Sequence, residues 1–65
     1  MPAVRSSAIA SIDYDPGTRR LSVRFHETGL YSYYGVPASV YEAMLRASSV
    51  GRFFNDNIRD YYSAA

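Results

Sequence analysis

The spacing of apolar residues changes once along this chain, from alternation before Gly35 to helical spacing after it. Leu21, Val23 and Phe25 alternate with polar or charged residues, which is the pattern of a strand with one buried face. Residues 40–61 instead repeat apolar side chains three or four positions apart, as amphipathic helices do. The order of these patterns predicts an α+β fold in which strands come first and helices follow.

Two polar turns divide the first half of the chain into three short strands. The turn Asp15-Pro16-Gly17-Thr18 contains a proline that presets one backbone angle and a glycine that tolerates a positive one. It joins a strand over residues 9–14 to a strand over 21–26, so that the two form a hairpin. A second turn, residues 26–29, leads to a third strand over 30–34. The expected sheet is a three-stranded antiparallel β-meander.

Two helices are predicted to follow and to pack on one face of this sheet. Pro37 suits a first helical turn, where its missing N–H would have been unpaired. The first helix carries an apolar stripe made by Val40, Tyr41, Met44, Leu45 and Ser48. Ser48 and Ser49 are candidate N-caps for a second helix. Its predicted buried stripe is Phe54, Ile58 and Tyr61.

The length of 65 residues allows one domain, residues 1–65, with a core over about 7–62. Hydrophobic residues make up 48% of the chain, and cysteine is absent, which excludes disulfides, thiolate nucleophiles and cysteine-bound zinc. No apolar run approaches the roughly 20 residues of a membrane span. We therefore expect a cytoplasmic protein without membrane contact, and a homo-oligomer is a further expectation because so small a domain gains by burying surface.

Residues that carry catalysis or bind metals are scarce and scattered. The single histidine, His26, stands beside Glu27 at a strand end, where exposed polar residues are common. The carboxylates lack the spacing of a calcium loop, and the serine pairs lack the glycines that flank a hydrolase nucleophile. The sequence predicts a protein that is not an enzyme and needs no cofactor or metal.

Two tyrosines, Tyr31 and Tyr33, are expected side by side on one face of the third strand. Aromatic rings on a sheet can stack with nucleic-acid bases, each worth about 1 to 3 kcal/mol. If the helices cover that face, both rings are core aromatics instead. The pattern leaves the two interpretations open.

A second candidate surface is the helix face that carries Arg52, Asn55 and Arg59. All seven basic residues are arginines, whose planar guanidinium suits phosphate and carboxylate, although a GC-rich genome also favours arginine over lysine. Arg52 and Arg59 are seven residues apart and are therefore expected close to one helix face, where they could grip a phosphate. In the alternative, Arg52 pairs with Asp56 as an ordinary surface ion pair.

Five short patterns in this order resemble the KTSC domain family over nearly the whole chain. They are Tyr14-Asp15-Pro16, Leu21-x-Val23-x-Phe25, Tyr31-x-Tyr33-x-Gly35-Val36-Pro37, Tyr41, and Gly51-Arg52-x-Phe54-Asn55-x-x-Ile58-Arg59. The family is named for a domain at the C-terminus of some lysyl-tRNA synthetases and also occurs as stand-alone bacterial and phage proteins. The resemblance implies a role in RNA binding.

Together these features lead to one main hypothesis and two alternatives. The main hypothesis is a small module that binds RNA or another phosphate-bearing ligand through Tyr31, Tyr33, Arg52, Asn55 and Arg59. The net charge of only +1 weakens attraction to a polyanion unless hairpin arginines 19, 20 and 24 converge with the helix arginines on one side. The alternatives are a protein-interaction domain, and an oligomeric phage protein that sequesters a host nucleotide signal.

Overall fold

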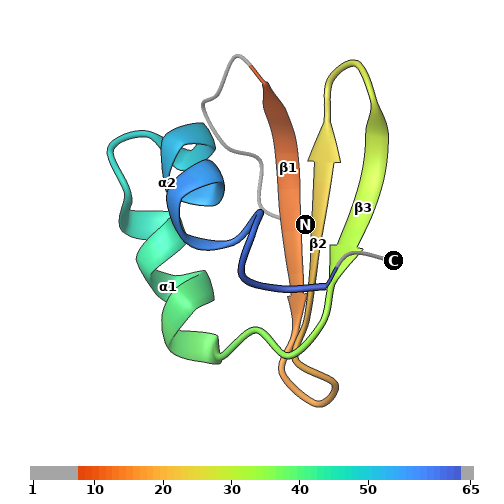
Figure 1. Ribbon diagram of the computed structural model, residues 1–65, viewed down its shortest axis with the longest axis vertical. Coiled ribbons are helices and arrows are strands. Elements are labelled where there is room, and N and C mark those ends of the chain that lie inside the picture. The colour runs from red at the N-terminus through yellow and green to blue at the C-terminus, as the bar shows by residue number, and fades with distance from the viewer. Residues whose placement is uncertain (1–7, 64–65) are drawn as a thin grey trace.

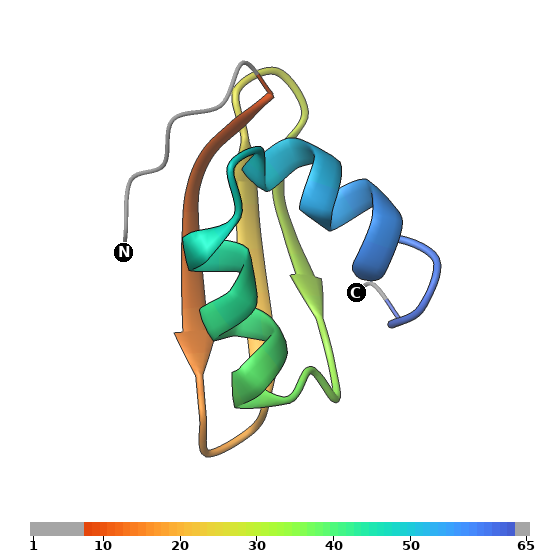
Figure 2. The same cartoon turned by 90° about the vertical axis from the view of Figure 1, so that its left-hand side faces the viewer.

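The computed structural model describes residues 8–63, with a sheet on one side of the molecule and two helices on the other (Figure 1). The elements are β1 (Ile9–Asp15), β2 (Arg20–Phe25), β3 (Gly29–Tyr33), α1 (Ala38–Arg46) and α2 (Val50–Asn57). Both helices lie against the same face of the sheet, as the second view makes clear (Figure 2). The predicted α+β fold, with three strands followed by two helices, is confirmed.

The sheet is antiparallel with strand order β1-β2-β3, so β1 and β3 are its edges. Leu21 in the central strand is paired with Tyr14 on one side and Tyr33 on the other. Because side chains alternate between faces, these three residues point toward the helices. Neither α1 nor α2 covers the opposite face, and there Leu30 and Tyr34 are 52% and 46% exposed.

The turn between β1 and β2 forms where the sequence predicts it. A side-chain oxygen of Asp15 accepts the backbone N–H of Gly17 at 2.9 Å, the usual role of aspartate in a turn. The expected positive backbone angle, however, falls on Arg19, with φ of 57°, and not on the glycine of this turn. The carbonyl of Arg19 accepts the N–H of Val36 at 3.0 Å, and this contact with a distant residue holds the strained angle in place.

The core lies between the sheet and the helices. Its fully or nearly buried members are Ile9, Ile12, Leu21, Val23, Tyr33, Val36, Met44, Val50, Phe54 and Ile58. The predicted stripe of α1 was too wide, because Leu45 is 43% exposed and Ser48 lies beyond the helix, which ends at Arg46. At 3.6 residues per turn, the neighbours Met44 and Leu45 point about 100° apart, and only Met44 faces the sheet.

Helix α2 begins at a serine cap, as predicted, because the Ser49 hydroxyl accepts the N–H of Arg52 at 3.3 Å. The helix ends earlier than its apolar spacing suggests. The N–H groups of Ile58 and Arg59 both donate to the carbonyl of Phe54, at 3.0 and 2.9 Å, which closes the last turn.

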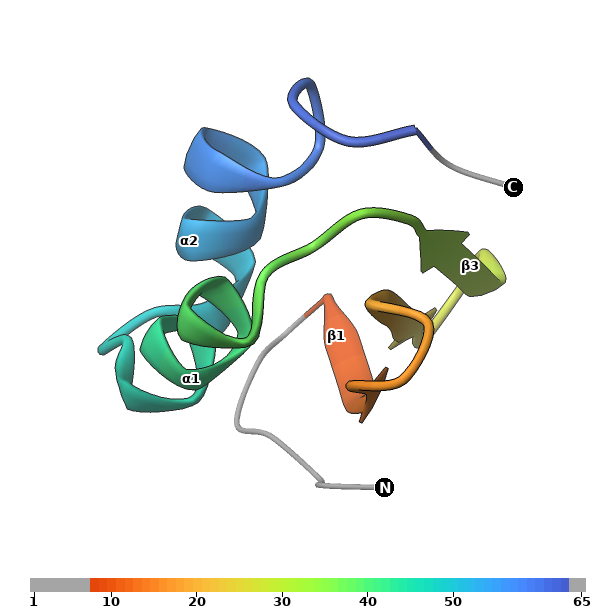
Figure 3. The same ribbon diagram turned by 90° about the horizontal axis from the view of Figure 1, so that it is seen from below.

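After α2 the chain returns to the sheet (Figure 3). The N–H of Tyr34 donates to the carbonyl of Ser63 at 3.1 Å, which fixes the end of this segment beside β3. The prediction that Tyr61 is buried was therefore wrong, since Tyr61 is 72% exposed. Helical spacing no longer applies beyond Asn57, and Tyr62 packs against the core instead.

Candidate functional site

A pocket of about 330 Å³ lies where α2 faces β2 and β3. Its lining residues are Phe25, Thr28, Tyr31, Tyr33, Phe54, Asn55 and Arg59. Four of the five residues that the sequence analysis selected therefore meet in one place, and Arg52 is the exception.

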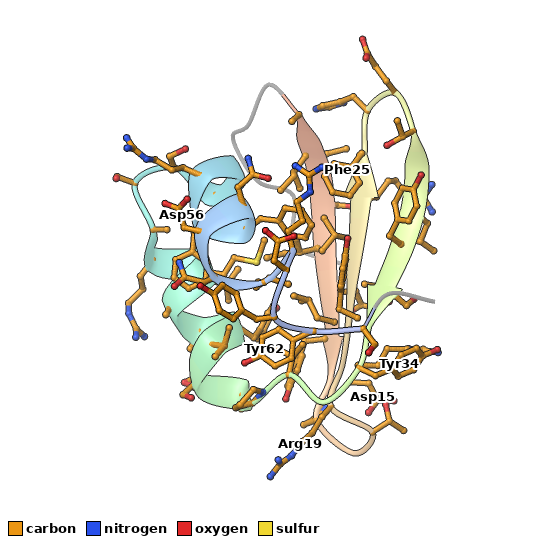
Figure 4. The ribbon with its side chains drawn as sticks, viewed as in Figure 1. Asp15, Arg19, Phe25, Tyr34, Asp56 and Tyr62 are labelled. Carbon is orange, nitrogen blue, oxygen red and sulfur yellow. The ribbon has the colours of Figure 1, made fainter. Side chains whose placement is uncertain are left out.

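The pocket has an aromatic floor that begins at Phe25, near the end of β2 (Figure 4). The ring of Phe25 contacts Tyr31 and Phe54 edge-to-face, with ring centroids 5.7 and 5.3 Å apart. Tyr33 contacts Phe54 in the same way at 5.3 Å. Edge-to-face contacts of this kind hold the rings in fixed orientations, so the floor is built in advance of any ligand.

The two tyrosines of β3 differ in exposure. Tyr33 is 6% exposed and belongs to the core, whereas Tyr31 is 37% exposed. The interpretation as a core aromatic therefore fits Tyr33, and the interpretation as an exposed stacking surface fits Tyr31. Within residues 8–63 the Tyr33 hydroxyl forms no hydrogen bond, and no buried side-chain oxygen or nitrogen there lacks a partner. The Tyr33 hydroxyl must then reach solvent, and it presents a polar group at the pocket.

Arg59 provides the positive charge of the pocket. A guanidinium nitrogen, Nη1, donates to Oδ1 of Asn55 at 3.5 Å, a long hydrogen bond that directs the side chain along α2. In the described range, 8–63, the one ion pair is formed by Arg52 and Asp56, so Arg59 has no carboxylate partner there. An exposed guanidinium without a counter-ion is available to an anion.

The pKa of Tyr33 reports the electrostatics of this pocket. Burial raises the pKa of the Tyr33 phenol above its ordinary value, because a buried phenolate would lose its hydration. The nearby charge of Arg59 acts in the opposite direction, and Tyr31 adds a smaller upward contribution to the same pKa. Arg59 also lines the pocket, so its charge faces what occupies it.

Arg52 lies in an adjoining pocket at the start of α2. Its Nε is 3.8 Å from Oδ2 of Asp56, the surface ion pair that the sequence analysis gave as the alternative. Asp56 projects from the side of α2 away from the sheet (Figure 4). Arg52 and Arg59 line different pockets, and Arg59 lies beyond the end of α2, so the predicted shared helix face is not formed.

The hairpin arginines do not join them. Arg24 is exposed in β2 next to the inward-facing Phe25, so its side chain lies on the uncovered face of the sheet. Arg19 is in the turn at the far end of the molecule from Phe25 (Figure 4). Arg19 and Arg24 therefore do not gather with Arg52 and Arg59 on one side.

Phe25, Thr28 and Phe54 line the pocket and were not among the predicted site residues. The sequence analysis assigned the two phenylalanines to the core and Thr28 to a turn. The alternation of β2 already placed Phe25 on the inner face, but only the register shows that it ends its strand opposite Gly29, beside Tyr31.

Two further properties bear on the kind of site. In residues 8–63 no three histidine or acidic side chains are grouped so that they could hold a metal ion. None of the helices in that range is long and apolar enough to cross a membrane. His26 is exposed in the turn between β2 and β3.

Fold and pocket define a small two-layer α+β domain with an aromatic pocket, bordered by Arg59, between β3 and α2. The KTSC domain family matches residues 5–62, and the chain belongs to that family.

Relatives agree with this assignment. The chain is 41% identical over 64 residues to a protein of Tsukamurella paurometabola, covering 98% of this chain and 96% of that one. It is 45% identical over 53 residues to an uncharacterized protein of Stutzerimonas stutzeri, covering 82% and 75% of the two chains. The crystal structure of a KTSC domain protein from Yersinia pestis superposes with a TM-score of 0.96 at 41% identity, over 98% of this chain and 90% of that chain.

Proposed function

We propose that this domain is a non-catalytic module that binds a single nucleotide unit, with the base against Tyr31 and the phosphate on Arg59. The observation that carries the proposal is the placement of an exposed aromatic ring and of a guanidinium that has no ion-pair partner within residues 8–63 around one pocket. Bases stack on aromatic side chains, and arginine binds phosphate through charge-assisted hydrogen bonds.

The size of the pocket supports a small ligand. Pockets for small molecules range from about 300 to 1,000 Å³, and a pocket of about 330 Å³ is at the lower end of that range. The Tyr33 hydroxyl and the Asn55 amide add polar groups that could fix the orientation of a base.

The charge distribution favours one nucleotide over a long strand. Affinity for a nucleic-acid backbone grows with the number of phosphates that basic residues neutralise. The net charge is +1, Arg24 lies on the opposite face, and Arg52 is paired with Asp56. A free nucleotide or one unstacked nucleotide of an RNA is the ligand that this arrangement suits.

Titration with the four nucleoside 5′-monophosphates and with labelled single-stranded RNA tests the proposal. We expect saturable binding that weakens with salt, and a loss of about tenfold in affinity for Arg59→Ala, the equivalent of one charge-assisted hydrogen bond. Arg24→Ala is the matched control, since it removes the same charge from the uncovered face. Equal losses in both variants, or no saturable signal at all, would contradict the proposal.

A protein-interaction domain is a second candidate, supported by the exposed apolar residues Leu30 and Tyr34 on the uncovered face of the sheet. A partner protein that is retained after nuclease treatment and lost in Leu30→Ser would favour this function. Retention of the partner by the Leu30→Ser variant would count against that face.

A further inference from the structure

The pocket at Tyr31 adjoins a second and larger one. The second pocket measures about 540 Å³ and lies along the first half of α2. Phe25, Phe54 and Asn55 line both pockets, so these three residues form the boundary between them, and the two neighbouring pockets are called the groove below.

Each half of the groove has its own arginine. Arg59 lines the half that contains the tyrosines, and Arg52 lines the other half. Arg52 is in the first turn of α2, and Arg59 lies just beyond the last residue of that helix. The structure therefore places the two guanidinium groups at different pockets and not around one point.

We propose that the groove binds two consecutive nucleotides of one strand, with the second phosphate on Arg52; this inference rests on the function proposed above. The aromatic boundary of Phe25 and Phe54 separates two positions, and each position offers one cation. A mononucleotide occupies the half that contains Tyr31, and a dinucleotide occupies both halves.

The ion pair of Arg52 regulates the second position. The side chains of Arg52 and Asp56 are 84% and 64% exposed, and ion pairs this exposed contribute little to stability. A phosphate therefore competes with the Asp56 carboxylate for the same guanidinium at small cost. Asp56, although it projects from the outer side of α2, is also among the residues that border this pocket, and its negative charge opposes an anion there.

Binding of adenosine 5′-monophosphate and of 5′-phosphorylated diadenylate distinguishes the two positions. In the unaltered chain the dinucleotide should bind at least about tenfold more tightly, the equivalent of one added charge-assisted contact. Arg59→Ala should weaken both ligands. Arg52→Ala should weaken only the dinucleotide, and Asp56→Asn should tighten only the dinucleotide, by about threefold for an exposed pair.

The failures of the two proposals differ from one another. If the monophosphate binds and the dinucleotide binds no better, or if Arg52→Ala weakens both ligands equally, the two-nucleotide groove is wrong and the single-nucleotide function stands. If neither ligand binds, both proposals are overturned. Arg24→Ala controls for net charge, and circular dichroism confirms that each variant is folded.

Discussion

Tyr14 and Tyr33 lie on opposite edge strands, on either side of the buried Leu21, and yet their surroundings differ. The Tyr14 ring stacks on Tyr41 of α1 at 4.8 Å with an interplanar angle of 13°, and its hydroxyl donates to the carbonyl of Val36 at 2.6 Å. The Tyr33 ring meets an aromatic edge, and its hydroxyl has no partner within residues 8–63. One edge of the helix–sheet interface is closed and the other is open.

The difference follows from where each helix ends. Helix α1 runs beside β1 with Tyr41 in position to cover Tyr14. Helix α2 stops at Asn57, and the chain then turns back toward β3. The polar atoms of Tyr33 and Arg59 consequently remain available. The tyrosine hydroxyl of the closed side is therefore used within the fold, whereas that of the open side faces a pocket.

The largest effect is expected for Phe54→Ala, since Phe54 is 5% exposed and contacts both Phe25 and Tyr33. Removing a buried phenylalanine costs about 3 to 5 kcal/mol in the free energy of unfolding. Denaturation with urea measures this loss. Phe53→Ala is the control, because Phe53 is only partly buried and should cost less. A loss no larger than that of the control would mean that the floor of the pocket is not part of the core.

A smaller effect separates the two tyrosines directly. Tyr14→Phe leaves the Val36 carbonyl without its 2.6 Å donor, and an unsatisfied buried acceptor costs about 1 to 3 kcal/mol. Tyr33→Phe removes a hydroxyl without such a partner and should change stability by less than about 0.5 kcal/mol. Urea denaturation of both variants compares the two losses in the free energy of unfolding. Similar losses would show that the tyrosine hydroxyls of the open and closed sides stabilise the fold equally.

The strands and the first turn could be predicted because alternation, proline and glycine are local signals. Leu45 was misplaced because its neighbour Met44 is the one that faces the sheet, and Tyr61 because its burial depends on where α2 ends. The end of α2 is associated with a distant contact, the bond between Tyr34 and Ser63. A pattern of apolar spacing contains no information about such a contact.

The candidate site was predictable in part for the same reason. Tyr31 and Tyr33 are two residues apart on one strand and therefore share a face. Asn55 and Arg59 are four residues apart, which brings their side chains together. Local geometry therefore predicts that the members of each pair are neighbours. That the two pairs line one pocket, and that Arg52 lines a different one, depends on how α2 lies across the sheet. Tyr31 and Tyr33 are identical residues on one strand face, so the sequence does not indicate that one is buried and the other exposed.

The smallest effect concerns proton binding at high pH. Burial raises the pKa of Tyr33 and of Tyr41, so the folded protein keeps these two phenol protons at a pH where the unfolded chain, with a tyrosine pKa of about 10, releases them. Because the folded state then binds more protons, the free energy of unfolding should fall as the pH rises above about 10. Tyr33→Phe and Tyr41→Phe should each reduce that fall, with stability at pH 7 as the reference.

The neighbouring charges allow the two sides to be titrated separately. Arg59 lowers the pKa of Tyr33, whereas Asp13 raises the pKa of Tyr41 in addition to burial. Arg59→Ala should therefore raise the pKa of Tyr33, and Asp13→Asn should lower the pKa of Tyr41. Nuclear magnetic resonance of carbon-13-labelled tyrosine rings resolves the two residues. Shifts in the same direction would contradict this assignment, while opposite shifts would establish that Arg59 acts at the open edge, where an anionic ligand would compete for its charge.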